Sequence, residues 1–95
     1  MENNIIRLEF NNSINRLAGN DYGKEIFNSQ VKERYSLMNK NIIIFPPYIE
    51  NIAISFVQGF TDQIFSEIEK GQFYNYFEIQ GSKRVVDKFE RSIYF

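Results

Sequence analysis

Near the middle of the chain, residues 41–45 have the sequence Asn-Ile-Ile-Ile-Phe, an apolar run that Pro46 and Pro47 end. A β-branched run without polar alternation is typical of a strand covered on both faces. Neither proline can donate a hydrogen bond to a sheet, so we expect the strand to stop there. The run therefore predicts a strand over residues 41–45 that is buried on both faces.

Strand and helix patterns alternate on either side of this run. Ile6, Leu8 and Phe10 alternate with Arg7 and Glu9, which is the period of a half-exposed edge strand over residues 5–10. Apolar positions at helical spacing, or again at strand spacing, mark the other elements. These are helices over residues 16–35, 55–70 and 82–94, and a strand over residues 73–79 with Phe73, Phe77 and Ile79 on one side.

Six alternating elements in 95 residues indicate one α/β domain over residues 1–95. We expect a small single-layer sheet of three to four strands, at least partly parallel, with helices packed on it. Gly19 and Gly23 lie in the first predicted helix, where glycine lowers helix propensity. They either allow the backbone to approach the sheet closely, or the helix begins later, near Asp21.

The composition closes most routes to catalysis. The chain has ten phenylalanines and six tyrosines but no histidine, cysteine or tryptophan. A cysteine nucleophile, a disulfide, a Cys/His zinc site and an imidazole base are therefore excluded. The carboxylates show no close pairing suited to acid–base work, so we expect no enzyme, no cofactor and no bound metal. Most phenylalanines are assigned to the core, and Tyr74 and Tyr76 to an exposed patch that could support a homodimer.

Charge limits the partners that the chain is expected to bind. Eleven basic and twelve acidic residues give a net charge of −1, which does not favour nucleic acid. Residues 41–80 contain five acidic side chains and only Lys70 as a cation, so a partner docking there by charge would be basic. No secretory leader and no membrane-spanning apolar stretch are evident. We therefore expect a cytoplasmic protein that does not contact a membrane.

Ser55 begins the strongest predicted helix, and Gln58 follows three residues later. This spacing is that of a capping box, in which the serine hydroxyl accepts a hydrogen bond from a backbone N–H of the first turn. The alternative is that Ser55 is a phosphorylation site, because a phosphate there would meet free N–H groups at the positive end of the helix.

The layout resembles the STAS-like proteins, relatives of the anti-sigma-factor antagonist (STAS) domain. Residues 15–19 (Asn-Arg-Leu-Ala-Gly) are similar to the segment before the family's first helix. Residues 43–50 and then 52–56, ending in Ser55-Phe56, stand where the family has Asp-Phe-Ser-Gly-Val leading to Ser-Phe. Phe45-Pro46-Pro47-Tyr48 replaces the Asp-Phe-Ser-Gly of that pattern. The resemblance implies a regulatory fold with Ser55 as its switch.

Two functions follow as expectations. The first is a regulatory module that docks a protein partner, either an ATP-binding kinase-like regulator or an anti-sigma-type one, through the N-terminal end of the central helix. Its expected contact residues are Tyr48, Glu50, Asn51, Ser55, Gln58 and Asp62. The second is a small inhibitor encoded by a phage or mobile element, which would block a basic host protein with an acidic face. That face would be formed by Glu50, Asp62, Glu67 and Glu69.

Overall fold

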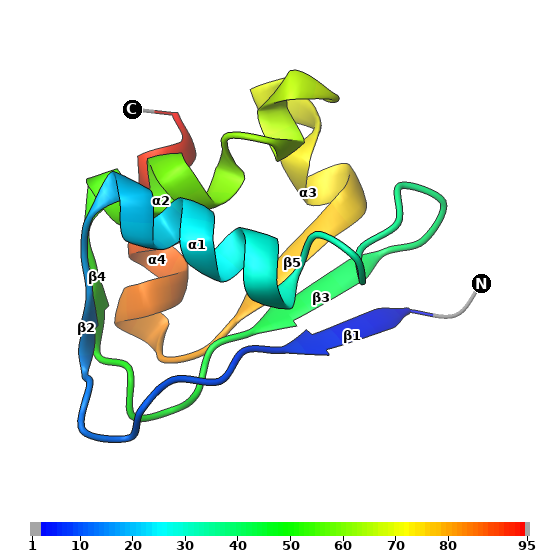
Figure 1. The fold of residues 1–95 in the computed structure, drawn as a ribbon. Coiled ribbons are helices and arrows are strands. Elements are labelled where there is room, and N and C mark those ends of the chain that lie inside the picture. Colours follow the sequence, from blue (N-terminus) through cyan, green and yellow to red (C-terminus); the bar gives the residue numbers. More distant parts are fainter. Residues whose placement is uncertain (1–2, 95) are drawn as a thin grey trace.

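The computed structural model describes residues 3–94 of the chain, and its main sheet has three parallel strands. The strand β3 (Asn41–Ile44) lies in the centre, with β1 (Asn4–Arg7) on one side and β5 (Phe77–Gln80) on the other (Figure 1). Both pairings are parallel, as expected for strands that are joined by helical crossovers. The predicted α/β class and parallel sheet are confirmed.

Three longer helices pack together against this sheet (Figure 1). They are α1 (Asn20–Gln30), α2 (Ile54–Thr61) and α4 (Lys83–Ile93). Every second residue of the strands faces them, and Ile6, Ile43 and Ile79 lie side by side in register and are buried. None of the helices within residues 3–94 is long and apolar enough to cross a membrane.

The opposite face of the sheet is not covered by these helices. Ile42 and Ile44 of the central strand point to that face and are half-buried, and Ile5 beside them on β1 is 46% exposed. The prediction that β3 is covered on both faces is therefore wrong. The physical reason is that all three longer helices lie on one side, where they enclose the core.

Seven of the nine phenylalanines within residues 3–94 are buried, so the predicted aromatic core is confirmed. They are Phe27, Phe45, Phe56, Phe60, Phe73, Phe77 and Phe89. Phe60 lies at the centre of this group, with ring centroids 5.8 Å from Phe56, 5.8 Å from Phe27 and 6.1 Å from Phe89. Offset and edge contacts of this kind stabilise a core beyond the area they bury.

A second, two-stranded parallel sheet precedes α1 and α2. It pairs β2 (Arg16–Leu17) with β4 (Asn51–Ile52), and each of these strands leads into a helix. This corrects the prediction of one helix over residues 16–35, because residues 16 and 17 are extended and α1 begins at Asn20. For Gly19, the structure agrees with the interpretation that the helix begins later, near Asp21. Gly19 has φ 102° and stands just before α1.

The crossing of α1 and α2 depends on two glycines. A Cβ atom on Gly23 would lie 2.2 Å from the carbonyl oxygen of Phe56, and one on Gly59 would lie 2.0 Å from that of Asn20. The two helix backbones are therefore in direct contact. Close backbone approach was expected of Gly23 toward the sheet, but the structure places it against α2.

The predicted helix over residues 55–70 is shorter than expected. α2 ends at Thr61, and two 3-10 turns follow, η1 (Ile64–Ser66) and η2 (Lys70–Gln72). Ile64 in η1 is buried, so this segment still contributes to the core. Its apolar spacing suggested a longer α-helix, but the chain forms 3-10 turns there.

The strand predicted over residues 73–79 begins late, because Phe73–Tyr76 forms the short helix α3. The rings of Phe73 and Phe77 stack with centroids 4.9 Å apart, one helical turn from each other. Tyr74 and Tyr76 are half-buried against the core, so the predicted strand-face patch of exposed tyrosines does not form.

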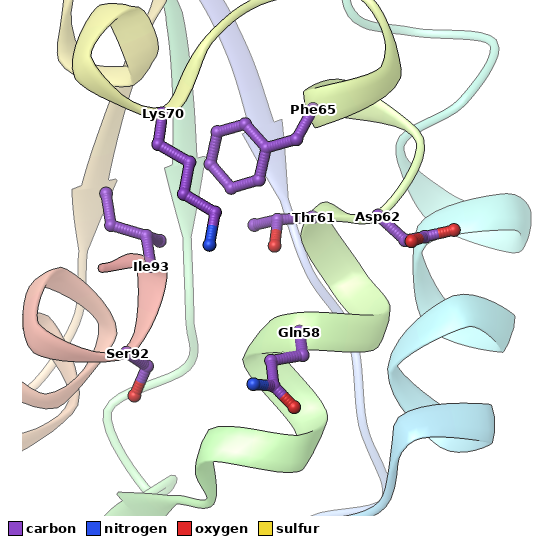
Figure 2. Close-up of a pocket in the computed structure, with 7 residues that line it drawn as sticks. All are labelled: Gln58, Thr61, Asp62, Phe65, Lys70, Ser92 and Ile93. Carbon is purple, nitrogen blue, oxygen red and sulfur yellow. The ribbon is translucent and has the colours of Figure 1, made fainter. Parts of the chain in front are cut away.

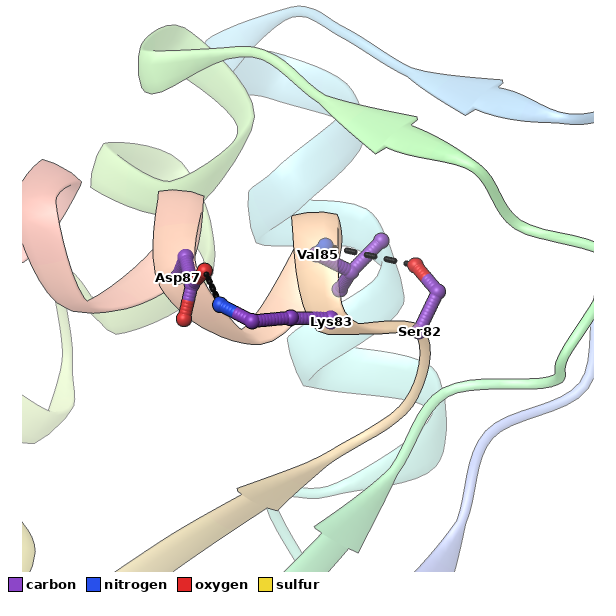
Figure 3. Close-up of polar contacts among 4 residues, drawn as sticks. All are labelled: Ser82, Lys83, Val85 and Asp87. Carbon is purple, nitrogen blue, oxygen red and sulfur yellow. Dashed lines mark hydrogen bonds and ion pairs between the residues drawn. The ribbon is translucent and has the colours of Figure 1, made fainter.

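The last helix agrees closely with its prediction over residues 82–94. α4 follows Ser82, whose Oγ accepts a hydrogen bond from the Val85 N–H at 3.3 Å, and Lys83 pairs with Asp87 one turn on at 2.7 Å (Figure 3). Val85 is the buried residue of the first turn, whereas the expected Val86 is half-buried.

Candidate functional site

Ser55 does not cap the central helix. The extended residue before α2 is Ala53, whose carbonyl accepts hydrogen bonds from the N–H groups of Phe56 and Val57. Pairing of β4 with β2 fixes this start, because the Ala53 N–H donates to the Leu17 carbonyl at 2.8 Å. The predicted capping box is therefore wrong. The half-buried Ser55 hydroxyl instead accepts a hydrogen bond from the Gly19 N–H at 3.1 Å and so joins the starts of α1 and α2.

Three other predicted contact residues lie in the connection from β3 to α2. The Tyr48 hydroxyl donates to the Phe10 carbonyl at 2.5 Å. The Glu50 N–H donates to the Asn15 carbonyl at 2.7 Å, while its side chain is exposed. The Asn51 side-chain oxygen accepts a hydrogen bond from the Ile52 N–H. Tyr48 and Asn51 thus use their polar atoms to hold loops in place, and of the three only Glu50 has an exposed side chain.

Gln58 and Asp62 are the two predicted contact residues that the structure brings together. They lie one turn apart at the end of α2 and line a pocket of about 200 Å³ (Figure 2). The Lys70 side chain points into this pocket from η2, whereas the Asp62 carboxylate is directed away from it toward α1 (Figure 2). Among the described residues that line the pocket, Asp62 has the one carboxylate, and it points away from Lys70 (Figure 2).

The chemistry available in this pocket is limited. The hydroxyls of Thr61 and Ser92 donate to carbonyls of their own helices, at 2.7 Å to Val57 and 2.6 Å to Lys88. Pockets that hold small ligands usually measure about 300–1,000 Å³, so this one is small. Among residues 3–94, no three acidic side chains gather into a group that could hold a metal ion.

Two tyrosines, Tyr35 and Tyr74, have strongly raised pKa values. Burial, together with a hydrogen bond to Glu67, raises the pKa of Tyr35 to about 12, and its hydroxyl donates to Glu67 at 2.6 Å. Burial and the nearby Glu90 raise the pKa of Tyr74 to about 12. Both phenols thus stay protonated over the neutral range, where each acts as a packing group and, for Tyr35, as a hydrogen-bond donor.

The uncovered sheet face is the largest feature that the sequence reasoning missed. We call it the open face and define it by two rows in register, which are Ile5, Ile42 and Glu78, and Arg7, Ile44 and Gln80. Isoleucines occupy its centre and one position of the β1 edge, and the remaining edge positions carry charged or amide side chains. The alternation of Glu78 and Gln80 with buried Phe77 and Ile79 was the signal that could have revealed it, because it shows β5 to be polar on one side.

A groove of about 540 Å³ adjoins the open face along β1. Its lining residues are Arg7, Leu8, Glu9, Arg34, Ile44, Pro46 and Pro47. Arg7 and Arg34 are exposed, and neither makes an ion pair within residues 3–94, where Lys83 and Asp87 form the pair that the structure records. Two guanidinium groups against one carboxylate leave the groove with a net positive charge.

Comparison with known proteins does not add a family to this description. No protein-family model, curated protein or solved structure matches the chain. The resemblance to STAS-like proteins stays a prediction. The α/β class rests on the strand pairing described above.

Proposed function

We propose that this protein is a non-catalytic module that binds another protein through the open face of its sheet. The observation that carries the proposal is the partial exposure of Ile42 and Ile44 on the central strand. In most α/β domains helices cover both faces of a parallel sheet, so an uncovered central strand leaves apolar surface for a partner.

The distribution of side chains on the open face supports this proposal. Its apolar centre is bordered by Arg7 on one edge strand and Glu78 on the other. Protein interfaces commonly have such an apolar core with a polar rim, and the rim charges help to select the partner. An exposed isoleucine on an edge strand, Ile5, extends the apolar centre outward.

The N-terminal end of α2 is the second candidate docking surface. It is favoured less, because Tyr48, Asn51 and Ser55 direct their polar atoms to internal hydrogen bonds. A switch by phosphorylation of Ser55 and a kinase-like or anti-sigma-type partner remain predictions of the family resemblance. The inhibitor alternative also remains a prediction, and it would use the exposed carboxylates of Glu50, Asp62, Glu67 and Glu69.

Affinity purification from the source cells with quantitative mass spectrometry tests the open face directly. The bait carries Ile5→Gln and Ile44→Gln together, and the matched control is Tyr94→Gln, which replaces another large exposed side chain, 59% exposed, at the end of α4. Completing the burial of two partly exposed isoleucines contributes roughly 2 kcal/mol to binding, so we expect recovery of the partner to fall at least tenfold.

The control should recover the partner as the unchanged protein does. Equal recovery by the Ile5/Ile44 variant and the unchanged protein would show that binding does not involve the open face. A third bait carries Glu50→Lys and Asp62→Lys. If this bait loses the partner while the Ile5/Ile44 variant keeps it, docking occurs at α2 or the acidic face.

A further inference from the structure

The outer edge of β1 has unused backbone hydrogen-bonding groups. The Asn4 N–H donates to the Lys40 carbonyl and the Leu8 N–H to the Ile44 carbonyl, both toward β3. In a parallel pair alternate residues bond to the neighbouring strand, so Ile5 and Arg7 direct their N–H and C=O groups away from β3. In the sheet formed by the described residues, β1 has no second neighbour on that side (Figure 1).

This edge is closed at its far end by a side chain. The carboxamide of Gln30, at the end of α1, accepts a hydrogen bond from the Glu9 N–H at 2.7 Å and donates one to the Glu9 carbonyl at 2.8 Å. The amide thus occupies the place that the peptide group of another strand would take. Proteins commonly protect edge strands in such ways. Gln30 covers the edge at Glu9 only. We call the remaining part, at Ile5 and Arg7, the window, because another strand can pair with the backbone there.

We infer that an extended segment of a partner protein adds to the sheet at this window, with an apolar and an acidic side chain two positions apart. Side chains two apart on an added strand share the face on which Ile5 and Arg7 lie. The residue opposite Ile5 then extends the apolar centre, and the residue opposite Arg7 meets the positive groove. This inference rests on the proposed function, since it names the mode of binding at the open face.

The charge of the groove selects this occupant over a second copy of the chain. Arg7 and Arg34 face the groove with Glu9 as its carboxylate, so an acidic side chain is attracted there. Two copies paired through β1 would each bring their own Arg7 to the junction, together with Arg34 beside it. Like charges placed close together oppose pairing. The window is only two residues long, so binding should be weak and reversible.

A displayed library of random octapeptides, selected on the immobilised protein, tests the inference without knowledge of the natural partner. We expect enrichment of peptides with an apolar residue and an Asp or Glu two positions apart, the apolar residue first in a strand parallel to β1 and second in an antiparallel one. The Arg7→Glu/Arg34→Glu variant should instead enrich peptides with an apolar residue and a Lys or Arg two positions apart, because the groove charge is reversed at two exposed positions. Peptides from the first selection should bind this variant at least fivefold more weakly by fluorescence anisotropy. Unchanged peptide charge on the variant would overturn the inference.

Ile5→Pro provides the second arm, because it removes an outward N–H at an edge position that tolerates proline. We expect it to abolish the enrichment, with its urea midpoint checked against the unchanged protein. If the Ile5→Pro variant does not fold, the selection on the Arg7→Glu/Arg34→Glu variant tests the inference by itself. A dimer in sedimentation equilibrium that Ile5→Pro dissolves would also overturn the inference, by showing a second copy at the edge. If no pattern is enriched while the Ile5/Ile44 variant still loses its cellular partner, the inference fails and the proposed function stands.

Discussion

Gly59 of α2 lies directly against the backbone of α1, which makes Gly59→Ala a demanding test of the helix crossing. The added Cβ would lie 2.0 Å from the Asn20 carbonyl oxygen and 2.8 Å from its carbon. Cβ contacts below 3.0 Å essentially do not occur, so α1 and α2 must separate by at least about 1 Å. The obstacle is backbone, and no side-chain rotation can relieve it.

The size of the effect follows from two opposing contributions. Overpacking a close contact costs about 1–3 kcal/mol, and the rigid neighbour here places Gly59→Ala at or above the top of that range. Alanine in a helix gains about 1 kcal/mol over glycine. Separation of the helices also weakens contacts such as that of Phe27 with Phe60, whose centroids are 5.8 Å apart. We therefore expect a net loss of about 2 kcal/mol or more in the free energy of unfolding.

Urea unfolding followed by circular dichroism measures this loss, with Gly71→Ala as the matched control. A Cβ on Gly71 would meet nothing within 4 Å, so the control should stay within about 0.5 kcal/mol of the unchanged protein. Gly23→Ala should destabilise similarly, and the double variant by less than the sum, because both methyl groups push apart the same two helices. A Gly59→Ala protein as stable as the control, or full additivity with Gly23→Ala, would refute the close crossing.

Three further predictions concern polar groups. Asn41 is fully buried and its side chain bonds to Asn4, Ser36 and Tyr76, so Asn41→Ala should cost about 3 kcal/mol in urea unfolding; a loss below 1 kcal/mol would contradict this. Ser55→Ala removes the acceptor for the Gly19 N–H and should cost about 1 kcal/mol, while a phosphate mimic, Ser55→Asp, that leaves recovery of every partner unchanged would argue against a switch. Because the folded pKa values of Tyr35 and Tyr74 are about 12, above the usual 10, their contribution to stability is complete below pH 10 and is lost between pH 10 and 12. Tyr35→Phe and Tyr74→Phe should each flatten that decline. Absorbance at 295 nm should lose late-titrating signal in each of these variants, and an unchanged titration curve would contradict the raised pKa values.

The parts of the fold that the sequence predicted well are those with a long, unambiguous period. α4 repeats its apolar positions over three turns and begins after a serine that does cap it, so its bounds were predicted within a residue. α3 was missed because Phe73 and Phe77 are four residues apart, which places them on one side in a strand and in a helix alike. Strands of two residues, such as β2, are too short to show any period.

The candidate site was harder to predict, because it depends on which face of the sheet the helices leave uncovered. The isoleucine run of β3 suggested burial on both faces, and nothing in that run distinguishes Ile43, which is buried, from Ile42 and Ile44. Only the neighbouring strands carry the difference, through Arg7 and Glu78. Ser55 was assigned to the wrong helix start for a related reason: the hydrogen bond that decides its role comes from Gly19, 36 residues earlier.

The uncovered face follows from how the chain uses its helices. α1, α2 and α4 all lie on one side, where they enclose the seven buried phenylalanines, and the backbones of α1 and α2 are in direct contact. Ile42 and Ile44 of β3 therefore stay half-buried among the described residues, and under the proposed function they are the residues that a partner covers. Gln30 closes the β1 edge at Glu9 but not at Ile5, so the part of the edge that stays open is the part next to those isoleucines.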